Sequence, residues 1–159
     1  MASTLKKTPL QVSVIETYSL NGRDHVVKNS AIYKDVRETT TKFITCPAGT
    51  GAAGTTTILD LDGDYTKTDI RYIRITNLDD GKTGEGGSNA FSGMVQLKIN
   101  STAPAVIQNV RLTAGSSFIL TDVGTPSGSE SLGTITVVND TGDDADAISV
   151  DVEVFVASV

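Results

Sequence analysis

The sequence predicts an all-β fold, an antiparallel β-sandwich of jelly-roll type with an extended N-terminal arm. Apolar residues recur at every second position in several segments, and short turn signals separate these segments. No segment has convincing helical periodicity, and we count eight to ten candidate strands. A chain of 159 residues with 38% apolar residues can bury one core, so we expect one domain over residues 1–159. A closed barrel is the alternative architecture.

The N-terminal region predicts an arm, a strand and a tight turn. Residues 1–9 are polar and carry Lys6 and Lys7, so we expect an arm that is ordered only against a neighbouring molecule. Residues 10–14 alternate between apolar and polar side chains, which predicts a strand with one buried face. Asn21-Gly22 suits a hairpin turn because both residues tolerate positive φ. Residues 26–38 are ambiguous between strand and helix.

Further strands are predicted along the rest of the chain. Residues 95–99 and 148–156 alternate cleanly, so each predicts a strand with one buried face. In DIRYIRITNL (residues 69–78) the apolar positions change parity, which predicts either a β-bulge or a strand buried on both faces. The turn sequence AGSS at residues 114–117 predicts a hairpin. The segments YIRITNLDDG and TITVVNDTGDD share a strand that ends in Asn before an acidic turn with Gly, a weak sign of repetition.

Two glycine motifs invite a nucleotide-binding interpretation, which the neighbouring residues oppose. Gly49, Gly51 and Gly54 have the spacing of a dinucleotide-binding loop, but TTTILDL follows, and this segment predicts a strand rather than the required helix. Gly81-Lys82-Thr83 resembles the end of a phosphate-binding loop, but the required first glycine is Thr76. We therefore expect neither motif to bind a nucleotide.

The remaining chemical candidates are equally sparse, so we expect no enzyme, no cofactor and no metal site. The carboxylates in DLDGD (residues 60–64) resemble the start of a calcium loop, but the bidentate Glu of an EF-hand is replaced by Arg71. The acidic run at residues 140–146 also fits solvated turn carboxylates. Cys46 and His25 are too few for a structural zinc site, and we interpret Cys46 as a small apolar residue.

Charge and composition limit the partners. A net charge of −6 opposes binding to nucleic acid and to anionic membranes, and no apolar run is long enough to cross a bilayer. One cysteine and a start without an apolar signal core predict synthesis in a reducing cytoplasm. Carbohydrate binding is the alternative to a structural role, with Tyr65 and Phe91 as its aromatic candidates, although the chain has no Trp.

Four segments, YIRITNLDD, VQLKIN, VRLTAGSSFIL and ITVVNDTGDDADAISVDVEVFVAS, resemble the small β-sandwich virion proteins of tailed bacteriophages. The resemblance covers about the last 90 residues and brings no functional residues with it. It implies a capsid decoration or cement protein, present in many copies and acting by contact, that is made in the host cytoplasm and located in the virion. A protein of the tail or tail fibre is the alternative.

Such a protein has other virion proteins and copies of itself as partners, and a host-surface glycan is a further candidate. We expect the assembly contacts in the arm, at Lys6 and Lys7, and in the loop from residue 79 to 89. The loop candidates are Asp79, Asp80, Lys82 and Asn89.

Overall fold

The computed structural model describes residues 6–49, 52–61, 63–65, 69–79, 93–101, 106–121, 132–139 and 149–159. Within these ranges the chain forms ten strands and no α-helix, so the all-β prediction is confirmed. The strands are β1 (Thr8–Leu20), β2 (Arg23–Val36), β3 (Glu38–Cys46), β4 (Thr55–Asp60), β5 (Ile70–Asn77), β6 (Val95–Ser101), β7 (Val106–Leu112), β8 (Ser117–Thr121), β9 (Leu132–Val138) and β10 (Val150–Ser158). A search of these residues for an apolar helix of membrane-spanning length finds no candidate.

Eight of the strands form a sandwich of two four-stranded antiparallel sheets, with the orders β3-β10-β5-β8 and β4-β9-β6-β7. The pairings are nested, because β3 pairs with β10, β4 with β9, β5 with β8, and β6 with β7. This is the pattern of a long hairpin rolled into two sheets, which defines a jelly roll. The predicted sandwich is therefore confirmed, and its strand order is that of a jelly roll.

The core lies between the two sheets and follows the alternation seen in the sequence. In β10 the side chains of Val150, Val152, Val154 and Val156 are at most 2% exposed. The inward residues of β6, Val95 and Leu97, are fully buried as well. Since every second residue of a strand points to the same face, the period-2 pattern was sufficient to predict this core.

Strand β5 contains a β-bulge and is also buried on both faces, so both explanations predicted for its irregular apolar pattern are confirmed. Ala157 pairs with Tyr72 and Ser158 with Ile70, so β5 carries one extra residue at this point, a β-bulge. The bulge changes the parity, so that Ile70 lies in the same core as Ile73. Tyr72 points to the opposite face and is still only 3% exposed, because the first hairpin of the chain covers it.

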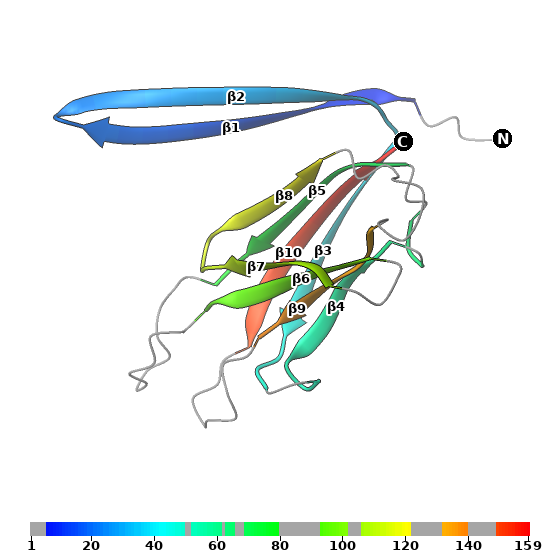
Figure 1. Ribbon diagram of the computed structural model, residues 1–159. Coiled ribbons are helices and arrows are strands. Elements are labelled where there is room, and N and C mark those ends of the chain that lie inside the picture. The colour runs from blue at the N-terminus through cyan, green and yellow to red at the C-terminus, as the bar shows by residue number, and fades with distance from the viewer. Residues whose placement is uncertain are drawn as a thin grey trace.

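Strands β1 and β2 form a separate two-stranded hairpin that extends across one side of the sandwich and past its edge (Figure 1). Asn21 and Gly22 have φ values of 51° and 73°, which confirms the predicted turn, and residues 26–36 are strand rather than helix. At roughly 3.4 Å per residue, the 13 residues of β1 make the hairpin about 45 Å long. The strand predicted at residues 10–14 is confirmed, and Leu10 and Val12 are half-buried on one face, but Val14 on the same face is 42% exposed.

The hairpin is a larger N-terminal extension than the sequence predicted. The predicted arm at residues 1–9 includes residues 1–5, which lie outside the described residues, and residues 8 and 9, which belong to β1. The extended N-terminal element of this fold is therefore the paired segment 8–36.

The hairpin predicted at residues 114–117 was wrong. A turn is present, with Gly115 at a φ of 70°, but β7 pairs with β6 in one sheet and β8 pairs with β5 in the other. The turn is a corner between sheets, held by the main chain of Asn77, which donates to the Ser116 carbonyl (3.0 Å) and accepts from Gly115 N–H (3.0 Å). Two alternating segments around a short turn look the same in both arrangements, so the local sequence could not distinguish them.

Candidate protein-binding surface

The base of the hairpin is anchored on the outer face of the β3-β10-β5-β8 sheet. Tyr72 and Ala157 of the sheet are buried there, beneath the half-buried hairpin residues Leu10, Val12 and Tyr33. The Tyr33 and Tyr72 rings lie 5.5 Å apart at their centroids, within the range of favourable aromatic pairs. This small apolar cluster fixes where the hairpin leaves the sandwich.

A β-bulge sets the direction of the hairpin at this base. Thr8 pairs with Val36 and Leu10 with Tyr33, so β2 has one residue more than β1, and Asp35 adopts a positive φ of 64°. The bulge places both Tyr33 and Val36 in the same apolar cluster. Directly after it, Arg37 N–H donates to the Ser158 carbonyl at 2.9 Å, which joins the hairpin to the C-terminal strand.

Beyond the base, the same face of the hairpin continues without a partner among the described residues. Even-numbered residues of β1 share this face with their cross-strand partners, because Leu10 pairs with Tyr33 and Leu20 with Arg23. We call the part from Val14 to the turn the distal stripe. Its large apolar side chains are Val14 (42% exposed), Tyr18 (49%), Leu20 (58%) and Val27 (39%).

The opposite face of the hairpin is also partly apolar. It carries Ile15, Val26 and Ile32, which are 59%, 65% and 62% exposed. These side chains alternate with Ser13, Ser30 and other polar residues, and the two serine hydroxyls hydrogen-bond at 2.9 Å. An isolated two-stranded hairpin is marginally stable in water. Exposed apolar residues on both faces are typical of a surface that binds another molecule.

A second exposed apolar position lies on the sandwich itself. Phe43, on the edge strand β3, is 71% exposed and is the most exposed large apolar side chain among the described residues. It points to the same outer sheet face that holds the hairpin base, opposite Glu153 of β10. Ile119 of β8 is 38% exposed on this face as well. Edge strands with exposed apolar residues are common sites of association.

The residues predicted as assembly contacts are not brought together among the described residues. Lys7 forms an exposed ion pair with Asp35 at the hairpin base (3.7 Å), and Lys6 is exposed beside it. Asp79 follows β5, and its N–H donates to the Asn77 side chain (3.0 Å). Asp80, Lys82 and Asn89 lie outside the described residues.

Sequence reasoning missed the hairpin surface, although a signal was present. Apolar residues continue past residue 14 to Leu20 and then flank the turn again at Val26 and Val27. A strand and its partner that are joined by a two-residue turn must lie side by side, so the apolar residues had to share the two faces of one ribbon. The missing information was that no second layer among the described residues covers them.

The glycine motif at residues 49–54 has a structural role. Strand β4 follows it directly, as predicted. A Cβ at Gly54 would approach the Gly49 carbonyl oxygen and lie 2.9 Å from the Asn139 carbonyl oxygen. The chain is therefore closely packed here, and Gly51 of the motif lies outside the described residues.

The acidic and aromatic candidates are engaged in local contacts. Asp60 accepts a hydrogen bond from Gly63 N–H (3.1 Å), and Asp64 forms an ion pair with Lys42 (2.9 Å), which raises the pKa of the lysine above its usual value. Tyr65 packs partly buried against the core under Lys42. Asp62, Phe91 and residues 140–146 lie outside the described residues, within which no cluster of three metal-ligating side chains occurs.

Cys46 and His25 occupy unrelated places. His25 stacks on Tyr18 near the hairpin turn, with ring centroids 5.1 Å apart. Cys46 is fully buried at the end of β3, where removal from water raises the pKa of its thiol from 9.0 to about 11. The structure therefore places Cys46 as an apolar core residue, in agreement with its interpretation from the sequence.

We expect the Cys46 thiol to be unreactive in the folded protein at about pH 8, and to react fully after denaturation. A disulfide-exchange reagent with an absorbing product measures this directly. Because burial raises the folded-state pKa, the thiol stabilises the fold fully below pH 9, and this contribution is lost as the pH rises from 9.0 to about 11. Cys46→Ala should therefore show a weaker loss of stability over that range. Rapid native labelling at about pH 8 would contradict the placement.

Comparisons with known proteins do not assign the chain to a family. No family model and no curated protein matches the chain. A solved structure described as "Bacillus endospore appendages form a novel family of disulfide-linked pili" aligns with 100% of this chain and 95% of its own, at 15% identity and a TM-score of 0.42. Because a TM-score this low does not establish a common fold, the function proposed below rests on other observations.

Proposed function

We propose that this protein is a non-enzymatic structural subunit of a phage particle, a decoration or cement protein that binds the outside of the head. The observation that carries the structural role is the β1–β2 hairpin, which extends past the sandwich with large apolar side chains exposed on both faces. The contact between Tyr33 and Tyr72 fixes the base of the hairpin on the sandwich, so the distal part can present its surface to a partner in a defined position.

The exposed hairpin side chains supply enough energy for a useful contact. Burying a Val, Leu or Ile side chain fully contributes roughly 1.5–3 kcal/mol, and these residues are already 39–65% exposed in the free chain. The free energy gained by burying several of these side chains exceeds the free-energy cost of bringing two molecules together only modestly. We therefore expect weak individual contacts that become effective when many copies bind to one symmetric particle.

The phage head is the finer part of the proposal and is supported by the resemblance of the strand segments to phage virion proteins. The jelly-roll sandwich is compatible with it, since viral capsid proteins use this architecture, but a fold alone does not define a function. Other virion proteins and further copies of the chain would then be the partners, and the virion the location. A site on the tail or tail fibre is the alternative within the same role.

Gold-labelled antibodies against the chain, applied to particles purified from lysates of the source culture, test the location by electron microscopy. Labelling on the head supports a decoration protein, and labelling confined to the tail supports the alternative. An absence of label on any particle, with the chain detectable in the lysate, would contradict the virion role.

A shortened hairpin tests whether this element makes the contact. Val12 and Ala31 pair directly and have the same parity as Leu20 and Arg23, which flank the turn. Removing residues 13–20 and 23–30 therefore joins the intact Asn-Gly turn to the hairpin base. We expect this variant to unfold within about 1 kcal/mol of the full chain, because the sandwich and the base cluster remain.

We expect the shortened variant to lose at least about tenfold in binding to particles stripped of the native protein, measured by co-sedimentation. The matched control is Thr57→Asp, which changes an exposed residue of β4 in the other sheet and should bind as the unmodified chain does. Equal binding of the shortened and unmodified chains would show that the hairpin is not the contact.

A further inference from the structure

We propose that the distal stripe of one copy docks on the outer face of the β3-β10-β5-β8 sheet of a second copy, around Phe43, in a head-to-tail contact. This inference rests on the proposed structural role and names the partner surface. The contact would have a donor, the hairpin, and an acceptor, the sheet, on every copy.

The donor face is continuous with a contact that already exists within the chain. Leu10, Val12 and Tyr33 lie on the same face of the hairpin as the distal stripe and are packed against the outer sheet face of their own sandwich. The hairpin therefore uses the first part of this face on its own sheet. The remainder, from Val14 to Leu20, is apolar apart from Glu16 and has no cover among the described residues.

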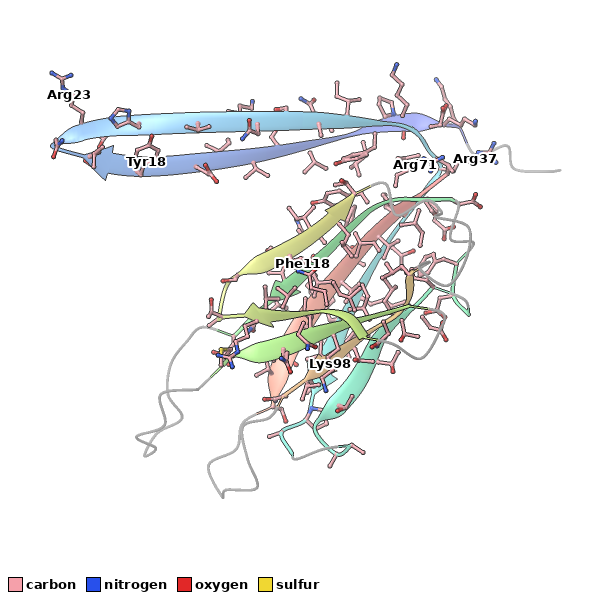
Figure 2. The ribbon with its side chains drawn as sticks, in the orientation of Figure 1. Tyr18, Arg23, Arg37, Arg71, Lys98 and Phe118 are labelled. Carbon is pink, nitrogen blue, oxygen red and sulfur yellow. The ribbon has the colours of Figure 1, made fainter. Side chains whose placement is uncertain are left out.

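The distal stripe extends away from its own sheet. The residues from Val14 to the turn extend roughly 25 Å beyond the base, at about 3.4 Å per residue. Figure 1 shows the tip of the hairpin well past the edge of the sandwich, and Figure 2 shows Arg23 at that tip, far from Arg37 and Arg71 at the base. A partner sheet must therefore come from another molecule.

The acceptor face carries matching apolar residues next to the internal contact. The row of cross-strand partners next to the hairpin base contains Phe155, which is partly buried, then Arg74, and then Ile119, which is 38% exposed. The following row contains Phe43 at 71% exposure. The acceptor face therefore presents separate apolar side chains around an ion pair, because Arg74 binds Glu153, the cross-strand partner of Phe43, at 3.1 Å.

Charge favours a donor on an acceptor over two donors together. The first 36 residues hold five of the 13 Lys and Arg residues and three of the 19 acidic residues, a net charge of +2 that leaves −8 for residues 37–159. Locally, Glu153 beside Phe43 is neutralised by its ion pair with Arg74 (3.1 Å), so the acidic group near Phe43 that keeps its negative charge is Asp151 in the next row. On the donor, Arg23 and Glu16 both lie on the face of the distal stripe, so the positive charge belongs to the N-terminal segment as a whole and not to this face alone. Two hairpins of equal positive charge would repel one another.

Adjacent valines provide a matched pair of variants for the donor. Val27 belongs to the distal stripe, whereas Val26 lies on the opposite face of the hairpin. We expect Val27→Asp to weaken self-association of the full-length chain at least about tenfold, and Val26→Asp to change it less than about threefold. Phe43→Asp tests the acceptor, with Thr57→Asp as its control. Sedimentation equilibrium over a range of protein concentrations measures all four.

Mixing the two defective variants gives the decisive measurement. Val27→Asp retains an intact acceptor and Phe43→Asp an intact donor, so an equimolar mixture should form a dimer although each variant alone is monomeric. Loss of association in Val27→Asp with no effect of Phe43→Asp, and no rescue on mixing, would mean that the hairpins pair with each other, which overturns the proposal. Equal effects of the two valine variants would also overturn it.

Cross-linking provides an independent test of the same contact. Cys46 is buried with a raised thiol pKa, so introduced cysteines react against a low background. Leu20→Cys mixed with Phe43→Cys should give a disulfide-linked dimer under mild oxidation, while neither variant does so alone. A monomeric unmodified chain that still binds particles would reject the self-contact and leave the proposed function standing, whereas a monomer that binds no particle would reject both.

Discussion

Replacing Asn77 by alanine is expected to lower the free energy of unfolding by about 3 kcal/mol, and Asn139→Ala by a similar amount. Both side chains are fully buried. The Asn77 amide, at the end of β5, donates to the carbonyl of Leu112 in the other sheet (3.1 Å) and to that of Gly93. The Asn139 amide, directly after β9, donates across the sandwich to the Cys46 carbonyl (2.9 Å).

The cost is large because each substitution leaves buried carbonyl groups without a donor and removes a link between the two sheets. Removing one partner of a buried hydrogen bond costs roughly 1–3 kcal/mol, and the lost side-chain volume adds to it. The double variant would lose about 6 kcal/mol, comparable with the total stability of a small domain, so we expect it not to fold at physiological temperature.

Urea denaturation of the purified chain measures these values, with Asn100→Ala as the matched control. Asn100 also lies in a strand, but its amide makes one half-buried bond to Thr134 (3.2 Å) within a single sheet. Its substitution should cost less than about 1 kcal/mol. If Asn77→Ala and Asn100→Ala were equally stable, the bonds between the sheets would not be the source of the stability.

Tyr72→Ala is expected to destabilise the protein by about 3 kcal/mol and to release the base of the hairpin. The Tyr72 ring contacts Tyr33 of the hairpin and lies 6.0 Å from the Phe155 ring, in an edge-on arrangement. Its loss opens a cavity under Leu10 and Val12, which then have little to hold them to the sheet.

Hydrogen exchange separates the two effects of Tyr72→Ala. Hairpin amides of β1 and β2 should exchange at least about tenfold faster, while amides of β6 and β9 in the other sheet should change only with global stability. Tyr72→Phe is the control and should keep both the hairpin protection and the global stability, because the ring contacts remain. Unchanged hairpin protection in Tyr72→Ala would mean that the cluster at the base does not anchor the hairpin.

The two similar segments YIRITNLDDG and TITVVNDTGDD, in each of which an Asn precedes an acidic turn, are explained by the role of their asparagines, Asn77 and Asn139. Asn77 is the last residue of β5 and Asn139 directly follows β9 in the other sheet, and each donates its amide to the opposite sheet. The sequence showed the similarity but could not show its cause, because the acceptors are main-chain carbonyls 35 and 93 positions away. Any residue supplies such a carbonyl, so no side-chain pattern indicates it.

Local alternation and turn chemistry were enough to predict the all-β class, the buried face of β10 and the tight turn at Asn21-Gly22. Alternation and turn chemistry both depend on short-range geometry, since side chains alternate along a strand and few residues accept a positive φ. The apolar character of Cys46 followed in the same way from its position in a strand pattern.

Only the tertiary structure decided which strands share a sheet and which apolar faces remain open. The turn at residues 114–117 became a corner between sheets, and the face from Val14 to Leu20 stayed exposed, although its pattern matches that of buried strands. Burial depends on whether a second layer is present, and that layer is formed by residues distant in the sequence. For the hairpin no such layer exists among the described residues, and this is why its surface indicates a partner.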